Sequence, residues 1–299
     1  MKDTETKTYT PLAWETVGCP ICASTKYTVY EKFGSNLQYT YVKCSNCGLI
    51  YQSPRPRYDQ DFIDSCYSSY YQYADNLQVE DLSHISESSL DMFKKEIEYI
   101  ARYDVHRSAV LDIGSGMGTF LHAAKPYYKN LIGLDVSEKM ASFVEKTVGI
   151  TVYISQYENF EWKMPFSLIH MSHVIEHIPN PNLWLQHSKK LLSKDGILVI
   201  NVPNKWGLGY RLQHLFYKLG FKRQFSDSWN DPVRTPDHLY EPTIRSFKYL
   251  LQKNGFQILE FYTYSRRDPA SNSNFTSKFL NRVLKIGSNI TFITKVANQ

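Results

Sequence analysis

The chain alternates between two hydrophobic patterns from about residue 84 onwards. Short, nearly unbroken apolar runs predict buried strands, and segments with apolar residues at three- and four-residue spacing predict amphipathic helices. The predicted strands cover residues 109–114, 130–137, 150–155, 166–173, 197–203, 256–265 and 290–296. The predicted helices cover residues 90–103, 118–127, 138–149, 182–196 and 241–255. Three of them end in a glycine, a typical stop signal (Gly149, Gly196 and Gly255). Strands separated by such helices predict βαβ units, a parallel sheet and hence an α/β fold.

Two C-x-x-C pairs precede this region, Cys19 with Cys22 and Cys44 with Cys47, with 21 residues between the pairs. Each pair forms a tight turn that directs two thiolates at one point, and four thiolates complete the tetrahedral shell that Zn²⁺ prefers. Short strands are predicted at 26–33 and 37–44, so the pattern indicates a zinc ribbon with a structural Zn²⁺. Four unrelated reduced cysteines are the alternative, and their spacing argues against it. Because four thiolates leave no open coordination position, catalytic zinc is not expected.

Composition narrows the class of protein. The 299 residues are 42% apolar and 21% charged, with a formal net charge of +5. This mild positive charge suits an anionic ligand better than a nucleic acid, which usually requires a denser basic stripe. The first ten residues lack an apolar signal segment, and no stretch approaches the roughly 18 apolar residues of a membrane span. Paired cysteines without disulfide-rich spacing are typical of a reducing compartment, so the sequence predicts a cytoplasmic protein.

The sequence SPRP at 53–56 punctuates the chain after the cysteine pairs and predicts a boundary there. A cluster of tyrosines follows, at Tyr58, Tyr67, Tyr70, Tyr71 and Tyr73. It predicts either a connecting helix packed on the next domain or a wall of the substrate pocket, since tyrosine combines an apolar face with a polar tip. Cys66 stands apart from the pairs and is interpreted as an ordinary buried thiol.

Candidate chemistry begins with the segment VLDIGSGMGTF at 110–120. Its glycines directly follow the first core strand, where the carboxyl ends of parallel strands bind ligands. They predict either a tight turn alone or a close approach of a ligand to the backbone. The next strand ends in Asp135, whose carboxylate can accept hydrogen bonds from both hydroxyls of a ribose. The order D-x-G-x-G-x-G differs from the G-x-G-x-x-G of dinucleotide sites, which weighs against an NAD-dependent enzyme.

Four segments in this order, VLDIGSGMGTFL, IGLDVS, HVIEHIPNP and LLSKDGILVINVPN, resemble the motifs of class I S-adenosylmethionine-dependent methyltransferases. The resemblance runs from about residue 109 to the C-terminus and implies a Rossmann-like, seven-stranded methyltransferase sheet. With the zinc ribbon in front, the chain resembles a bacterial subgroup common among sugar and polysaccharide methyltransferases. The implied domains are a zinc ribbon at 1–53, a tyrosine-rich helical connector at 54–95 and the methyltransferase domain at 96–299.

The resemblance implies a role for each matched residue. Asp112, Gly114 and Gly116 would line the methionine side of S-adenosylmethionine, and Asp135 would bind its ribose. Gly118 of the same loop is also a predicted cofactor-binding residue. Gln156 and Tyr157 would contact the adenine, although the family often has an acidic residue where Gln156 stands. Ser172 and His173 would lie near the sulfonium.

Methyl transfer to a hydroxyl also requires a base, and histidine is the natural one at neutral pH. The candidates are His173, His177 and His238. The structural alternative for His177 is an organising role. For the segment of His238, the structural alternative is that Glu241 caps the helix that follows. The expected acceptor is a hydroxyl or carbon of a sugar, a nucleotide-sugar or a polysaccharide-related small molecule.

Three other functions stay open. His173, Glu176, His177 and His238 are similar to the E-x-x-E-H and later histidine that bind Mg²⁺ in RNA 2′-O-methyltransferases, but His173 replaces a carboxylate that a hard cation would prefer. A quinone-type small-molecule O-methyltransferase and a non-catalytic zinc-ribbon scaffold are the others. Residues 204–236 mix aromatic and basic side chains and predict a lid over the acceptor pocket. Peripheral membrane contact through 205–225 and plain packing are the alternatives for that segment.

Overall fold

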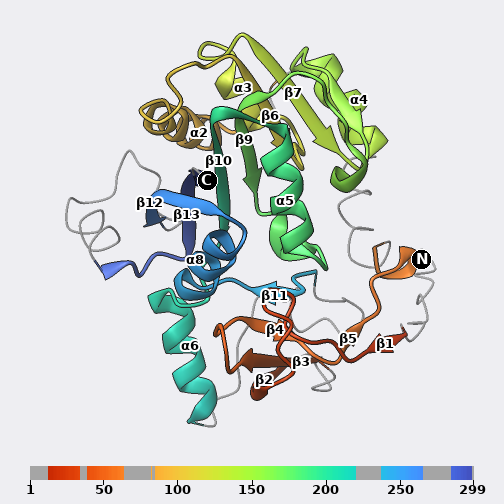
Figure 1. The fold of residues 1–299 in the computed structure, drawn as a ribbon, viewed down its shortest axis with the longest axis vertical. Coiled ribbons are helices and arrows are strands. Elements are labelled where there is room, and N and C mark those ends of the chain that lie inside the picture. The colour runs from red at the N-terminus through yellow and green to blue at the C-terminus, as the bar shows by residue number, and fades with distance from the viewer. Residues whose placement is uncertain are drawn as a thin grey trace, which may run out of the picture.

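The structure is a computed structural model, and it describes residues 13–33, 39–63, 82, 85–219, 237–264 and 284–297. A large sheet flanked by helices forms one part of the molecule, and smaller sheets near the N-terminus form the other (Figure 1). Cys66, Tyr67, Tyr70, Tyr71, Tyr73 and residues 220–236 lie outside the described residues, so the interpretations of these positions stay predictions.

The large sheet has seven strands in the order β12-β13-β10-β9-β6-β7-β8, which confirms the predicted seven-stranded α/β fold. The strands are β6 (Ala109–Ile113), β7 (Asn130–Asp135), β8 (Val152–Ile154), β9 (Phe166–Ser172), β10 (Leu192–Pro203), β12 (Phe256–Tyr264) and β13 (Asn289–Val296). The sheet is mixed rather than fully parallel, because β13 runs antiparallel to both β10 and β12. β12 and β13 are consecutive strands that pair directly, and such a pair needs no crossover helix.

Helices cover both faces of this sheet, and residues alternate between the two faces along each strand. α2 (Glu87–Ile100) and α3 (Thr119–Ala124) pack against Val110 and Val199. α5 (Pro181–Leu191) and α8 (Ile244–Lys253) pack on the opposite face, against Leu111 and Ile200. α4 (Glu138–Thr147) packs against β8 and α3. Burial on both faces explains why the central strands are continuous apolar runs in the sequence.

The predicted helix at 182–196 is wrong at its end. α5 ends at Leu191, and β10 begins at Leu192 with an irregular register up to Ile197. Gly196 lies within the strand, where a Cβ atom would be 2.7 Å from the backbone oxygen of Phe166. The glycine therefore permits a close approach of two strands and does not stop the helix.

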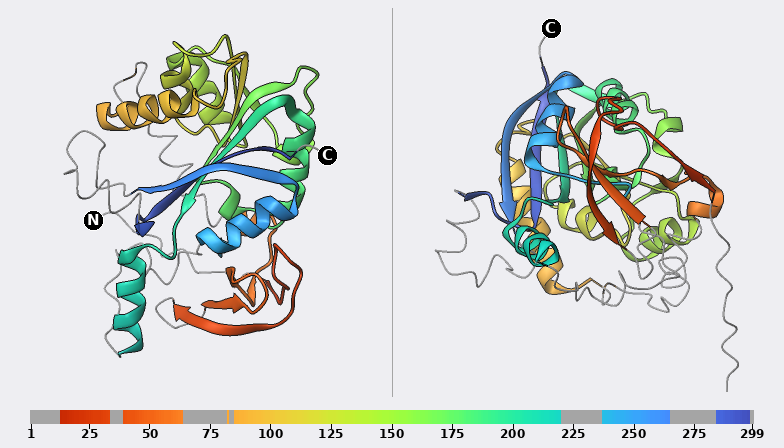
Figure 2. Two further views of the ribbon diagram at one scale, coloured as in Figure 1. Left: turned by 60° about the vertical axis from the view of Figure 1, so that its left-hand side comes forward. Right: turned by 90° about the horizontal axis from the view of Figure 1, so that it is seen from below.

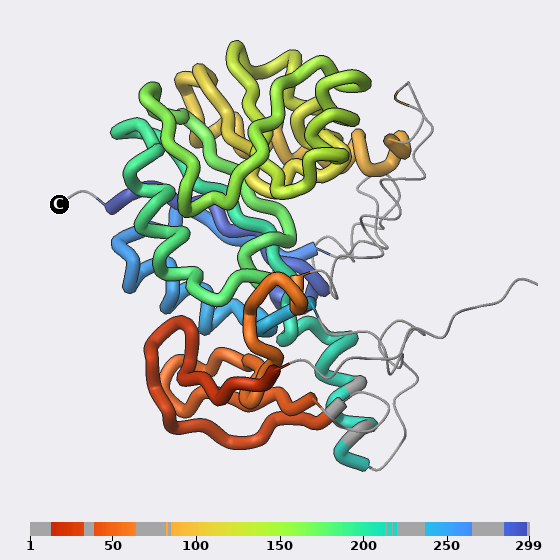
Figure 3. Tube along the Cα trace, turned by 90° about the vertical axis from the view of Figure 1, so that its right-hand side faces the viewer, coloured from red at the N-terminus to blue at the C-terminus, as the bar shows by residue number. Residues whose placement is uncertain are grey.

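The N-terminal module comprises β1 (Trp14–Glu15), β2 (Tyr27–Phe33), β3 (Tyr39–Cys44), β4 (Ile50–Gln52) and β5 (Arg55–Pro56). A distant segment, β11 (Tyr240–Glu241), completes its larger sheet in the order β11-β4-β3-β2. β5 pairs with β1, so residues 55–56 belong to this module although the sequence assigns them to the connector. The module lies directly against α8 and the start of α5 (Figure 3).

A single apolar cluster joins the N-terminal module to the large sheet. Val42, Leu49 and Tyr51 belong to the same cluster of buried residues as Phe247 and Leu250 of α8. Polar contacts reinforce this junction: Asn182 Nδ2 donates to the backbone oxygen of Pro20 at 2.8 Å, and Lys253 Nζ donates to that of Ile21 at 2.5 Å. The two parts therefore share one core.

α6 (Leu208–Lys218) follows β10 and extends away from the large sheet, beside the N-terminal module (Figures 1 and 2). It occupies part of the segment predicted as a lid. Among the described residues, no helix is long and apolar enough to cross a membrane.

Candidate active site

The glycine loop connects the end of β6 to the start of α3. Gly114 has φ +66°, and a Cβ atom there would be 2.5 Å from Cγ2 of Val174. Both the left-handed backbone and the close neighbour therefore require glycine at this position. Gly116 and Gly118 also have positive φ, and the backbone N–H of Gly116 points to the end of β7.

Asp135 at the tip of β7 receives that N–H. Its Oδ2 accepts from Gly116 N at 3.0 Å, and its Oδ1 accepts from Ser137 N at 2.9 Å. Burial raises the pKa of the Asp135 carboxyl, and these backbone donors act in the opposite direction. Each carboxylate oxygen accepts more than one hydrogen bond, so both retain capacity for a ligand hydroxyl. The two backbone donors hold the side chain in place, and the remaining lone pairs of its oxygens are available to accept hydrogen bonds from a ligand.

A cavity of about 820 Å³ opens beside this carboxylate. That volume suits a nucleoside-sized ligand together with a small partner. It brings together seven of the predicted site residues: Gly114, Asp135, Gln156, Tyr157, Ser172, His173 and His177. Gly116, Gly118, Asp112 and His238 are not among the residues that line it. The cavity therefore joins most of the predicted cofactor residues to two of the three candidate bases.

The cavity also has walls that the sequence did not single out. Gln60, Trp184 and Asp237 line it, from three separate parts of the chain. Nothing in their local patterns marks them, because their positions depend on long-range packing. Tyr58 lines the cavity as well, in agreement with the pocket-wall interpretation of the tyrosine cluster.

Asp112 lies beneath the glycine loop rather than in the cavity. It is 3% exposed, and its Oδ1 is 2.7 Å from Nδ1 of His170, its partner across β6 and β9. The His170 ring stacks on Phe120 at 3.7 Å, and Asn201 Nδ2 lies 3.3 Å from its other nitrogen. This buried network joins β6, which precedes the glycine loop, to Phe120 of α3, which follows it. The only sequence signal for it was a histidine inside an otherwise apolar strand.

Three histidines surround the buried carboxylate of Glu176, which is 0% exposed. His173 Nδ1 is 3.3 Å and His238 Nε2 is 4.0 Å from Glu176 Oε1. The rings of His177 and His238 meet edge to face at 4.8 Å. Burial alone would raise the pKa of Glu176, but the hydrogen bond from His173 and the neighbouring histidines outweigh it, so this pKa lies below its ordinary value.

His177 and His238 differ in charge. His177 Nδ1 donates to the backbone oxygen of Asp237 at 2.9 Å, because a carbonyl can only accept. Burial and the positive charge of His238 lower the pKa of His177, which keeps the ring neutral at pH 7. Burial opposes protonation of His238 too, but the hydrogen bond and charge of Glu241 raise its pKa to about 9. His177 therefore carries a lone pair at neutral pH, and His238 is a cation.

Glu241 connects this pair to a lysine. Its Oε1 is 3.6 Å from His238 Nδ1 and 3.5 Å from Lys205 Nζ. Although burial acts to raise the pKa of Glu241, these two cations lower it to about 2. The helix-capping role considered for Glu241 is not observed, because Thr243 caps α8.

The N-terminal module holds the backbone beside these histidines. Tyr41 Oη and Gln52 Nε2 donate to the backbone oxygen of His238, at 3.1 and 2.7 Å. β4 pairs with β11 immediately after it, and Leu239 N donates to the backbone oxygen of Glu176 at 3.0 Å. Residues 237–241 are therefore clamped between the module and the segment that carries Glu176 and His177.

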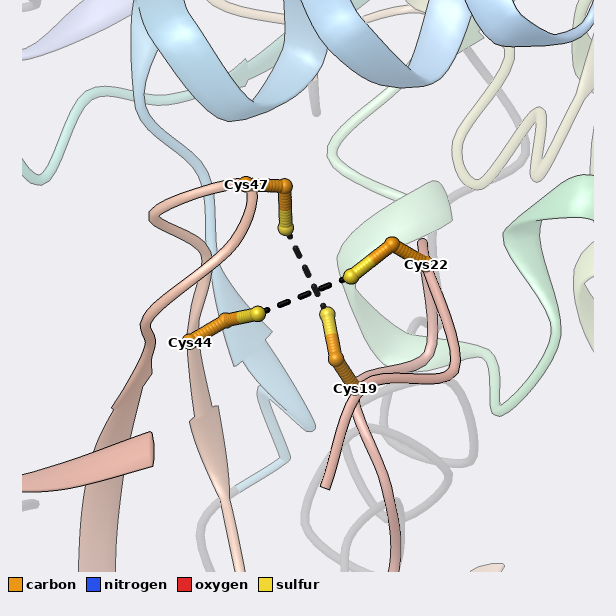
Figure 4. Close-up of side chains that lie close together, drawn as sticks. All are labelled: Cys19, Cys22, Cys44 and Cys47. Carbon is orange, nitrogen blue, oxygen red and sulfur yellow. Dashed lines mark hydrogen bonds between the residues drawn. The ribbon is translucent and has the colours of Figure 1, made fainter. Parts of the chain in front are cut away.

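The four paired cysteines converge at one point (Figure 4). The Sγ atoms of Cys19 and Cys47 are 3.5 Å apart, as are those of Cys22 and Cys44, and all four lie within 4.8 Å of one another. A tetrahedral site with Zn–S bonds of about 2.3 Å has S–S separations of about 3.8 Å. The four thiols therefore fit a zinc ion without rearrangement of the chain.

Comparisons with known proteins agree with this geometry. A family model described as a methyltransferase domain matches residues 88–260. The chain is 33% identical over 115 residues to the protein MJ1123 of Methanocaldococcus jannaschii, over 38% of this chain and 53% of that protein. It is 30% identical over 101 residues to the ubiquinone biosynthesis O-methyltransferase of Pelagibacter ubique, over 32% of this chain and 42% of that enzyme. The chain spans about half the length of these curated relatives.

Solved structures share the fold. An S-adenosylmethionine-dependent methyltransferase from Clostridium acetobutylicum superposes with a TM-score of 0.50 at 15% identity, over 78% of this chain and 99% of that one. The CcbJ methyltransferase from Streptomyces caelestis gives a TM-score of 0.50 at 12% identity, over 72% and 98%. The matched family accounts for more than half of the sequence. The chain therefore belongs to the methyltransferase-domain family and has the α/β fold of S-adenosylmethionine-dependent methyltransferases.

Proposed function

We propose that the protein transfers a methyl group from S-adenosylmethionine to a hydroxyl, or a carbon, of a sugar or related small molecule. The observation that carries this proposal is the shared cavity, in which the Asp135 carboxylate, the Gly114 turn and the neutral His177 meet. Methyl transfer to a hydroxyl requires a site that holds the cofactor and a base that faces the same cavity. Asp135 is the proposed partner of the cofactor ribose, and His177 is the proposed base. The domain limits 1–53, 54–95 and 96–299 remain part of the proposal.

Each cavity residue has a proposed task. S-adenosylmethionine, when bound, supplies an electrophilic methyl group on its sulfonium. Asp135 accepts hydrogen bonds from its ribose hydroxyls, and Gln156 and Tyr157 contact its adenine. Gly114 and Ser172 line the space for its methionine side and its sulfonium. Asp112 is paired with His170 and does not line the cavity, so its direct contact with the methionine side stays a prediction.

His177 is the proposed base. With Nδ1–H held by the backbone oxygen of Asp237, the neutral ring carries its lone pair on Nε2 and takes the proton of the acceptor hydroxyl there. His238 is a cation behind it and cannot accept a proton at neutral pH. Its proposed task is positioning. His173, held by Glu176, borders the same cavity and orients the acceptor.

Zinc bound by Cys19, Cys22, Cys44 and Cys47 is the second part of the proposal. The donor set is all thiolate, which suits a structural Zn²⁺. The site lies in the module that clamps residues 237–241, so the ion stabilises the backbone beside the base.

A sugar acceptor is supported by the polar cavity edge at Gln60, Asp237 and His173, together with the apolar faces of Tyr58 and Trp184. The similarity to a protein named as a ubiquinone biosynthesis O-methyltransferase supports a quinone-type small molecule as the alternative acceptor.

A second candidate is metal-assisted transfer, including transfer to an RNA 2′-hydroxyl. Ligand atoms of Glu176, His177 and His238 lie within 4.8 Å of one another. The ion pair between His238 and Glu241 competes with such a site. Addition of Mn²⁺ or Mg²⁺ to the zinc-loaded protein would raise turnover at least tenfold under this candidate and leave it unchanged under the first.

Two measurements test the main proposal. Calorimetry with S-adenosylmethionine is expected to show one site per chain, and an absence of binding would favour a non-catalytic scaffold. A screen of labelled methyl transfer onto nucleotide-sugars, quinone precursors and short RNA is expected to give product with the first group. Product with RNA alone would overturn the acceptor assignment while leaving the cofactor assignment intact.

A further inference from the structure

α6 presents an apolar stripe to the outside of the molecule. Leu208, Leu212, Leu215, Phe216 and Leu219 are 45–63% exposed. Their spacing of four, three, one and three residues places them on one face of a helix. Leu219 continues the stripe just past the helix end, because its N–H still donates to the backbone oxygen of Leu215 at 3.1 Å.

The opposite face of α6 is the one that packs on the protein. The His214 ring stacks on Tyr30 of β2 at 4.3 Å, and its Nδ1 is 3.7 Å from the buried carboxylate of Glu31. Lys205 lies over the ring of Tyr210 at 4.9 Å. The helix is therefore anchored through one face while the apolar stripe points outward.

Cations border the stripe. Arg211 and Lys218 are exposed and lie between the stripe and the anchored face, and residues 204–219 contain no Asp or Glu. Trp206, 47% exposed at the start of the helix, has Lys43 and Arg211 over its ring at 5.7 and 5.3 Å. An apolar stripe flanked by cations, in a segment without acidic residues, is typical of helices that lie in the interface of an anionic membrane.

We propose that α6 docks the protein on the surface of a bilayer that contains anionic phospholipids. The helix lies in the interface and does not span it, since 11 residues cover only about 16 Å of a hydrocarbon core about 30 Å thick. Leucine and phenylalanine side chains enter the acyl boundary, and the basic side chains remain at the headgroups. A second copy of this chain fits the surface less well, because two cationic borders would face each other.

Vesicle flotation tests the proposal with the zinc-loaded 299-residue chain. Binding is expected to vesicles of phosphatidylcholine with a quarter phosphatidylglycerol, to weaken with salt, and to be at least tenfold lower with phosphatidylcholine alone. Leu215→Glu is expected to reduce partitioning at least tenfold. Arg211→Gln is expected to reduce it about fivefold at low salt.

Leu183→Glu is the matched control, since Leu183 of α5 is 49% exposed and lies outside α6. It is expected to bind vesicles like the unmodified chain, and circular dichroism checks that both variants fold. Equal binding by Leu215→Glu and the unmodified chain would overturn the proposal, as would failure of the latter to float with anionic vesicles. Light scattering that shows a dimer lost in Leu215→Glu, without vesicle binding, would assign the stripe to a second copy. S-adenosylmethionine binding should be unchanged in Leu215→Glu, which separates this test from that of the proposed function.

Discussion

Side chains of the same residue type have different properties in this site, because their neighbours differ. His177 and His238 touch each other, yet one donates to a carbonyl and stays neutral, while the other faces Glu241 and is cationic. Asp112 and Asp135 end neighbouring strands, yet one is covered by His170 and the other opens onto the cavity. Roles in the site therefore depend on the partner of each residue more than on its type.

Asp135→Asn is expected to weaken S-adenosylmethionine binding about 30- to 100-fold. The substitution removes a charged acceptor worth about 2–3 kcal/mol and leaves an amide N–H facing the backbone donors of Gly116 or Ser137. Calorimetry measures the change. Glu138→Gln is the control, because Glu138 is exposed at the start of α4 and loses the same charge. Similar losses in both variants would mean that net charge, not ribose recognition, sets the affinity.

His177→Asn is expected to lower turnover by at least about 100-fold, the usual contribution of a general base, with cofactor affinity kept within about twofold. The pH dependence of turnover in the unmodified enzyme is a more specific test than the loss of turnover in the variant. Since the pKa of His177 lies below its ordinary 6.5, turnover should rise through that lower pKa and level off by neutral pH. A limb that rises only towards pH 9 would identify His238 as the base instead.

The ion pair of His238 and Glu241 should appear in the pH dependence of stability. The pKa of His238 is raised from 6.5 to about 9, so its contribution is complete below pH 6.5 and is lost as pH rises through 9. The pKa of Glu241 is lowered from 4.5 to about 2, so its contribution is complete above pH 4.5 and is lost towards pH 2. Urea unfolding should therefore show a decrease of up to about 3 kcal/mol between pH 6.5 and 9. This decrease should be absent in His238→Gln, and its persistence there would assign it to other groups.

At the scale of elements, periodicity predicted what local sequence determines. All seven core strands were predicted, because apolar runs such as 109–113 and 166–171 are buried on both faces. The end of α5 was missed, since Gly196 resembles a stop signal until the neighbouring Phe166 backbone is known. β11 was missed altogether: two residues carry no periodicity, and their pairing with β4 joins positions that are distant in the sequence. The cavity walls at Gln60 and Asp237 depend on the same kind of long-range contact.

Tyr41→Phe tests whether β3 and β4 position the histidine segment. Loss of the Tyr41 hydroxyl removes one of two side-chain donors to the His238 backbone oxygen. We expect a decrease of about 1 kcal/mol in the free energy of unfolding, a five- to tenfold lower turnover and an unchanged affinity for S-adenosylmethionine. Tyr51→Phe is the matched control, because Tyr51 is a buried tyrosine of the same sheet whose hydroxyl has no hydrogen-bond partner among the described residues. Equal effects of the two variants would argue against positioning by this bond.

At the scale of the whole molecule, the two parts meet beside the proposed base, because the N-terminal module contacts the backbone of residues 238–241. The proposed cofactor residues Gly114 and Asp135 belong to β6, β7 and their loops. The N-terminal module instead contacts α5, α8 and residues 237–241. Changes in the module should therefore reach the base before they reach the ribose site.

Loss of the proposed zinc ion tests that separation. The tight turn at Cys19–Cys22 presents the Pro20 and Ile21 backbone oxygens to Asn182 and Lys253, and Ile21 itself is fully buried. Without the ion, four thiols within 4.8 Å have no common ligand, and the turn loses its geometry.

Cys44→Ser is therefore expected to bind less than one zinc per chain, to melt several degrees lower and to lose most turnover. Its affinity for S-adenosylmethionine should change less than about threefold, because Asp135 and the glycine loop lie on separate elements. Metal analysis, calorimetry and methyl transfer on one preparation distinguish the outcomes. An equal loss of cofactor affinity and turnover would show that the module supports the whole fold rather than the histidine segment.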